Sequence, residues 1–202
     1  HQLARHAGDT LLVYVLNSVI YNYDLVGAAW SAAIDTLPGA VYAPPVYANA
    51  KLFYPLGTNG YSWQPTGAAT GATDVATPTV LDFQKWDNKL YCIDINGVLY
   101  SSPADTVAAN MGLAANWTTL AAIPAEWPVQ SFLNEIYDLT VYEDAGGDPI
   151  IYCRTTTGLW SYDAITDKWF QTNLRFPRSS LLSANYGQLG AVYHGMMFNQ
   201  AG

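Results

Sequence analysis

The sequence predicts an all-β fold made of small four-stranded antiparallel sheets that repeat along the chain. Three observations lead to this prediction. A short aliphatic and aromatic run recurs after polar turn residues, and a tryptophan recurs at the start of a later strand-like segment. Helical periodicity is nearly absent over the 202 residues. A repeating period-2 pattern with turn residues between the segments indicates strands joined by hairpins.

The clearest repeat is the strand predicted to be second in each unit. In "DNKLYCI" (87–93) and "GDPIIYC" (147–153) a Tyr-Cys pair follows aliphatic residues, and a glycine comes five residues after each cysteine, at Gly97 and Gly158. Polar turn residues before such a run are typical of the second arm of a hairpin. Three further segments fit the pattern: "TLLVYV" (10–15), "NAKLFYP" (49–55) and "HGMMFNQ" (194–200).

The segments around these landmarks repeat as well. A strand-like segment precedes two of them, in "TVLDFQKW" (79–86) and "IYDLTVYED" (136–144). A short strand follows four of them, in "SVIYNYD", "GYSWQP", "GVLYSS" and "GLWSYD". In three units a tryptophan then begins the next strand, at Trp30, Trp117 and Trp169. Each unit is therefore predicted to hold four short strands.

Two stretches depart from the strand pattern. "SPADTVAANMGLAANW" (102–117) has a helix-start signature and an alanine-rich body, so it is predicted to be a short helix or an irregular excursion between two strands. Residues 57–78 are rich in Gly, Ala and Thr and are predicted to form a long loop with at most one weak strand.

Repeated four-stranded antiparallel units with a recurring tryptophan are the sequence signature of a β-propeller. One small sheet buries little apolar surface by itself, whereas blades packed face to face bury both faces, with large aromatic rings between them. We predict a single propeller-like domain of four to five blades, as part of a larger ring or as a small five-bladed ring closed near His1. Its approximate units are 8–37, 38–77, 78–125, 132–175 and a partial unit at 182–202.

In "GLWSYDAITDKWFQT" (158–172) the chain resembles the kelch-like propellers, whose blades carry a similar aromatic, Tyr-Asp, turn and Trp pattern. "SVIYNYDLVGAAW" (18–30) is a looser match, and "AVYHGMMFNQAG" (191–202) resembles the opening strands of another such blade. The sequence departs from that family because it lacks the Gly-Gly doublet after the second strand. The resemblance covers about three units and implies a binding platform.

Composition excludes several functional classes. Only 12% of the residues are charged, against about 25% in an ordinary domain. The net charge of −8, with 8 Lys and Arg in all, disfavours nucleic acid and acidic membrane surfaces, which are bound mainly by basic side chains. No apolar run approaches the roughly 20 residues of a membrane-spanning helix, so no membrane insertion is predicted.

Catalysis, cofactors and metals are not predicted. His6 and His194 lie near the two ends, and no His and Cys spacing matches a zinc site. Acidic residues on or near strands, such as Asp82 and Asp138, show no pairing typical of a glycosidase. Cys92 and Cys153 are expected to be buried free thiols, because equivalent positions in neighbouring blades lie about 10 Å apart, too far for a disulfide.

Aromatic residues are the remaining candidates for binding. Trp30, Trp117 and Trp169 recur with the repeat and are predicted to pack between blades, as are Tyr91 and Tyr152. The tryptophans outside the repeat pattern, Trp63, Trp86 and Trp127, are the candidates for contact with a protein or a glycan.

The function predicted from these observations is a non-catalytic structural or interaction module of a larger assembly, with other protein subunits as its partners. The low charge and a surface rich in Ala, Thr and Tyr, together with ends that suggest a processed product or a segment of a longer polypeptide, favour a virion component such as a phage tail or capsid protein. An extracellular location is the other prediction. The alternative function is an extracellular carbohydrate-binding, lectin-like propeller with glycan partners.

Overall fold

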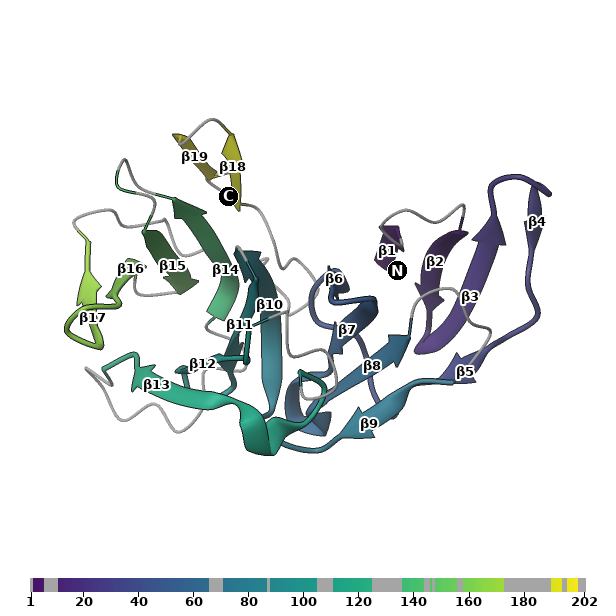
Figure 1. Cartoon of the computed structure of the whole chain (residues 1–202), viewed down its shortest axis with the longest axis horizontal. Coiled ribbons are helices and arrows are strands. Elements are labelled where there is room, and N and C mark those ends of the chain that lie inside the picture. Colours follow the sequence, from purple (N-terminus) through teal and green to yellow (C-terminus); the bar gives the residue numbers. More distant parts are fainter. Residues whose placement is uncertain are drawn as a thin grey trace.

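The computed structural model describes residues 2–5, 11–65, 71–86, 88–104, 111–124, 136–143, 146, 148–155, 158–172, 190–193 and 196–199. These residues form five antiparallel sheets (Figure 1). Helical structure in this described part is limited to two 3-10 turns, η1 (Gly57–Asn59) and η2 (Ala114–Asn116). The all-β, propeller-like prediction is confirmed.

Each sheet uses strands that are consecutive in the sequence, in simple meander order. The first sheet holds β1 (Gln2–Arg5), β2 (Leu11–Leu16), β3 (Val19–Asp24) and β4 (Ala29–Trp30), with β5 (Asp35–Thr36) also paired to β3. The second sheet holds β6 (Val46–Ala48), β7 (Lys51–Pro55), β8 (Tyr61–Pro65) and β9 (Thr73–Val75).

The remaining sheets follow the same order. The third holds β10 (Val80–Trp86), β11 (Lys89–Asp94), β12 (Val98–Ser101) and β13 (Thr118–Ala122). The fourth holds β14 (Ile136–Glu143), β15 (Pro149–Thr155), β16 (Gly158–Asp163) and β17 (Lys168–Gln171). The fifth has two described strands, β18 (Gly190–Tyr193) and β19 (Met196–Asn199).

The five repeated landmarks are the second strands of the five sheets, β2, β7, β11, β15 and β19. The register shows that the copies correspond residue by residue. Tyr91 of β11 lies opposite Ser101 of the next strand, and Tyr152 of β15 lies opposite Ser161. The two Tyr-Cys pairs therefore occupy equivalent positions in two copies of one repeated supersecondary unit.

The first strands of successive sheets lie side by side. β6 contacts both β1 and β10, and β14 contacts both β10 and β18. The sheets consequently follow one another as an arc, with their first strands toward the inside (Figure 1). A polar link joins two of these strands, because Oδ2 of the buried Asp82 in β10 accepts a hydrogen bond from the backbone N–H of Leu139 in β14 at 2.8 Å.

The core lies between the sheets, in three clusters that each draw on two successive sheets. Side chains of β11 show the arrangement: Leu90 and Cys92 pack toward the second sheet, whereas Tyr91 and Ile93 pack toward the fourth. This follows from the strand period of two, which sends successive side chains to opposite faces. A further cluster joins the first and second sheets through Val13, Val15, Ile20, Leu37, Leu52, Tyr54 and Leu56. The second and third sheets, which have a neighbouring sheet on each side, bury both of their faces, as predicted for blades packed face to face.

Two local predictions can be compared with these strands. β8 confirms the short strand predicted in "GYSWQP", and β9 is a second strand in residues 57–78, which were otherwise predicted to be loop. β9 is an exposed edge strand and needs no apolar alternation, so no periodic pattern marks it in the sequence. In 102–117 the described residues are irregular apart from η2, which agrees with an irregular excursion. Cys92 and Cys153 are free and buried, as predicted.

Candidate interaction surface

Two outer hairpins place a tryptophan opposite a tyrosine in the same register. In the fourth sheet, Trp169 of β17 pairs with Tyr162 of β16, and the ring centroids lie 5.4 Å apart. In the first sheet, Trp30 of β4 pairs with Tyr23 of β3, and the ring centroids lie 4.9 Å apart. Trp30 and Trp169 therefore occupy equivalent positions in their sheets.

Trp117 holds the corresponding place in the third sheet. Thr118 of β13 pairs with Ser101 of β12, which puts Trp117 opposite Ser102, one residue beyond the pairing. The Trp117 ring centroid lies 5.9 Å from that of Tyr61 in the second sheet, and the side chain is 8% exposed. Its ring is thus covered by the preceding sheet.

Trp169 is also covered by the preceding sheet. It is 5% exposed, and its Nε1 donates a hydrogen bond to the carbonyl oxygen of Ala121 in β13 at 2.9 Å. Close by, the Asp167 carboxylate accepts hydrogen bonds from the Tyr162 hydroxyl and from the backbone N–H of Ala121, both at 2.8 Å. Burial raises the pKa of Tyr162, and the hydrogen bond to the Asp167 carboxylate raises it further. At this contact the Trp169 indole N–H, the Tyr162 hydroxyl and the Asp167 carboxylate therefore all have hydrogen-bond partners.

Trp30 differs from both equivalents because 56% of it is exposed. Its ring packs on Tyr23 and on Tyr14, whose centroid is 5.7 Å away, and both belong to its own sheet. Tyr14 pairs with Tyr21, so these rings share one face of the sheet. We name it the aromatic face of the first sheet, defined by Tyr14, Tyr21, Tyr23 and Trp30. The opposite face of the sheet packs on the second sheet.

The aromatic face lies at one end of the arc (Figure 1), where β3 and β4 have no labelled strand beyond them. The equivalent residues of the fourth sheet, Trp160, Tyr162 and Trp169, are only 4–5% exposed. The four residues that define the face are uncharged, and the register puts Arg5 of β1 on the same side of the sheet, beyond Leu12. The face combines flat rings with hydroxyl and indole N–H groups, which suits docking to a neutral, partly apolar partner.

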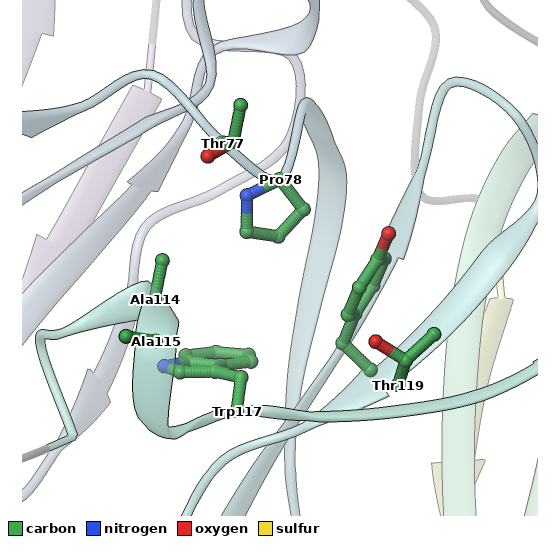
Figure 2. Close-up of a pocket in the computed structure, with 7 residues that line it drawn as sticks. Thr77, Pro78, Ala114, Ala115, Trp117 and Thr119 are labelled. Carbon is green, nitrogen blue, oxygen red and sulfur yellow. The ribbon is translucent and has the colours of Figure 1, made fainter.

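A second candidate is an open pocket of about 410 Å³ beside the third sheet, lined by Thr77, Pro78, Tyr100, Ala114, Ala115, Trp117 and Thr119. Figure 2 shows Thr77 and Pro78 on one side of the space and Ala114, Ala115 and Trp117 on the other. No charged side chain lines the pocket. Burial raises the pKa of Tyr100, and the Asp94 carboxylate adds to the shift, so its hydroxyl stays protonated near neutral pH. The lining suits a small uncharged ligand.

A buried ion pair joins the first two strands of the fourth sheet. Nη2 of Arg154 donates to Oδ2 of Asp138 at 2.9 Å, and both side chains are 4% exposed. Burial raises the pKa of the Cys153 thiol well above its usual value; Asp138 and Asp82 add to the shift, and Arg154 opposes it. Within the described residues no group of three or more His, Cys, Asp or Glu side chains could hold a metal ion. His6 and His194 lie outside the described residues.

The tryptophans proposed from the sequence as binding candidates are not brought together. Trp63 in β8 is half-buried, and Nζ of Lys51 lies 5.4 Å from its ring centroid. Trp86 at the end of β10 is half-buried against the core between the third and fourth sheets. Trp127 lies outside the described residues.

Sequence reasoning missed the tyrosines of the aromatic face. Tyr14, Tyr21 and Tyr23 were included in strands but not recognised as one surface. Their signal is the alternation in "YVLNSVIYNY" (14–23), which puts aromatic rings on the same side of a two-stranded hairpin. The pocket left no such signal, because its lining comes from three separate segments.

Comparison with known proteins supports the fold. No family model matches the chain, and no curated protein matches it in sequence. Among solved structures, it is similar to the extracellular domain of a protein assigned to a hybrid two-component system of Bacteroides thetaiotaomicron, with TM-score 0.58 and 19% identity over 90% of this chain and 22% of that one.

Two further structures match almost the whole chain. An auxiliary nutrient binding protein of Bacteroides thetaiotaomicron gives TM-score 0.56 at 9% identity, over 98% of this chain and 46% of that one. The computationally designed Ika8 protein gives TM-score 0.56 at 10% identity, over 97% of this chain and 53% of that one. The chain thus spans between about a fifth and about half of these structures. At such identities the likeness shows the fold alone.

The comparisons support a propeller-like fold. They do not show the specific kelch repeat family that the sequence resembles. No helix in the described part of the chain is long and apolar enough to cross a membrane.

Proposed function

We propose that the chain is a non-catalytic interaction module of a larger assembly, which binds another protein through the aromatic face of the first sheet. The single observation that carries this proposal is the contrast between equivalent tryptophans. Trp169 and Trp117 are covered by a preceding sheet, and Trp30 is 56% exposed. An exposed aromatic surface of this kind is typical of protein interfaces, where Trp and Tyr are enriched among the few residues that dominate the binding energy.

The kind of assembly remains the one predicted from composition, a virion or another extracellular structure. The low charge and aromatic-rich surface support a subunit that is covered by neighbours. The likeness to extracellular domains supports the extracellular location, and none of the structures reported above comes from a virion.

The proposal predicts that the chain is a stoichiometric component whose incorporation depends on Trp30. The assembly is purified from the organism that makes it, with a tagged wild-type chain, Trp30→Ala or Ile165→Ala, and subunit ratios are measured by quantitative mass spectrometry. Ile165 is a matched control, because it is 93% exposed at a hairpin turn of the fourth sheet. We expect a fixed ratio for wild type and Ile165→Ala, and at least a tenfold loss for Trp30→Ala. Equal incorporation of all three contradicts the proposal.

The pocket beside the third sheet favours carbohydrate binding as a second candidate function. Hydroxyl groups beside an aromatic ring, without charge, suit a neutral sugar that stacks one face and hydrogen-bonds through its rim. The lining threonines Thr77 and Thr119 and the ring of Trp117 provide this chemistry.

Titration with a panel of neutral mono- and oligosaccharides, followed by calorimetry, tests this second candidate. Thr119→Val keeps the side-chain shape and removes one hydroxyl, which is expected to weaken sugar binding by roughly five- to tenfold if one hydrogen bond worth about 1 kcal/mol is lost. Thr118→Val, at the neighbouring exposed position that does not line the pocket, is the control. Absence of binding by any sugar eliminates this function.

A further inference from the structure

The aromatic face of the first sheet continues a series of three interfaces. The first sheet packs on the second, the second on the third and the third on the fourth, each through a cluster of side chains from both partners. In the third and fourth sheets the tryptophan beside or in the last strand is directed at the preceding sheet. The same residue of the first sheet is directed the same way and is exposed. Another sheet is therefore the occupant with the matching shape.

We propose that a sheet from a second copy of this chain docks on the aromatic face of the first sheet. This inference rests on the proposed function and names its partner. The docked sheet covers Trp30 and Tyr23 as the third sheet covers Trp169 and Tyr162, and it presents aliphatic side chains together with an outer-strand carbonyl for the indole N–H. Ala121 is the example of that acceptor within the chain.

The lengths of two of the similar structures favour a second copy as the source of this sheet. The nutrient binding protein and the designed protein each match 97–98% of this chain with only 46–53% of their own residues. Two copies of this chain therefore supply about the length of one such molecule. Closed symmetric association of identical subunits is also the commonest form of oligomer.

Charge does not oppose this contact at the interface itself. The four residues of the aromatic face are neutral, although each chain carries a net charge of −8. Asp24, next to Tyr23 in sequence, is engaged in its own turn, where Oδ1 accepts a hydrogen bond from the backbone N–H of Val26 at 2.8 Å. Because screening by salt weakens the repulsion between the whole chains, association is expected to strengthen as ionic strength rises.

The purified 202-residue chain provides the test. Its mass is measured by sedimentation equilibrium over a range of concentrations, for wild type, Trp30→Ala, Trp30→Lys and the control Ile165→Ala, with circular dichroism to verify folding. We expect wild type and Ile165→Ala to associate with the same dissociation constant. Trp30→Ala should raise that constant at least tenfold, and Trp30→Lys should leave a monomer, because it places an unpaired charge in a dry interface.

A second measurement avoids any variant. Hydroxyl-radical footprinting of wild type reports the oxidation rate of Trp30 at low and high protein concentration, and the rate should fall as the chain associates. A wild-type chain that stays monomeric, or Trp30 oxidation that is independent of concentration, overturns the second-copy inference. Protection of Trp30 in a monomeric chain by an added oligosaccharide also overturns it, in favour of a glycan.

These outcomes are separable from the fate of the proposed function. If the purified chain is monomeric but its incorporation into the native assembly still depends on Trp30, the partner is a different protein and the proposed function stands. If Trp30 affects neither experiment, both proposals fail.

Discussion

Replacing Asp138 with alanine is expected to destabilise the protein by about 3–5 kcal/mol, the usual effect of removing one partner of a buried ion pair. Asp138 and Arg154 are paired at 2.9 Å, and both side chains are 4% exposed. The alanine variant leaves the guanidinium charge in the interior without this carboxylate. Since whole domains are stable by only about 5–15 kcal/mol, the variant is expected to lose a large fraction of its free energy of unfolding.

Urea unfolding followed by tryptophan fluorescence measures this effect. Asp74→Ala is the control, because Asp74 lies exposed in β9, where it accepts a hydrogen bond from Ser62, and its loss should cost about 1 kcal/mol. The double variant Asp138→Leu, Arg154→Met should be more stable than Asp138→Ala alone, since it removes the buried charge as well. If Asp138→Ala unfolds at the same urea concentration as wild type, the ion pair contributes nothing.

Replacing Trp169 with alanine is expected to cost about 3–5 kcal/mol, the range for truncating a large buried aromatic side chain. The variant opens a cavity between the third and fourth sheets and removes the donor to the Ala121 carbonyl. Trp169→Phe should recover most of the loss, because it restores the apolar contact and lacks only a hydrogen bond worth about 1 kcal/mol.

The neighbouring residue of the same strand is the matched control. Phe170 is 52% exposed and points to the opposite face of the fourth sheet, so Phe170→Ala should change the free energy of unfolding by less than about 1 kcal/mol. Thermal and urea unfolding of both variants provide the comparison. Equal destabilisation at the two positions would show that the sheet-to-sheet contact is not the source of stability in this repeat.

Local patterns were sufficient to locate the repeat. The landmark segments of the first four sheets were recognised because the second strand of each is covered on one or both faces and must be apolar, as in β7 and β11. The Tyr-Asp-turn-Trp pattern could also be recognised from the sequence, because it lies within one hairpin. Tyr162 and Trp169 touch across one hairpin, so their partnership depends on residues only seven apart.

The candidate surface could not be predicted in the same way. Trp30 and Trp169 have the same local pattern, and the sequence therefore assigned both to packing between blades. The exposed fraction of each tryptophan depends on whether another sheet packs against its hairpin. The arrangement of the sheets decides this, and the sequence of the hairpin does not. Trp63 lies outside the repeat pattern, which predicted a binding role, and the structure places it half-buried beside Lys51.

The amino-acid sequence by itself determined the strand unit, its repetition and the large rings that separate neighbouring sheets, because hairpin register and alternation act over a few residues. Only the tertiary structure decided which copy of the tryptophan is covered and which is exposed, and that Asp82 of the third sheet meets the backbone of Leu139 in the fourth. These features depend on how separate sheets stack, and stacking brings together residues whose proximity leaves no periodic mark along the chain.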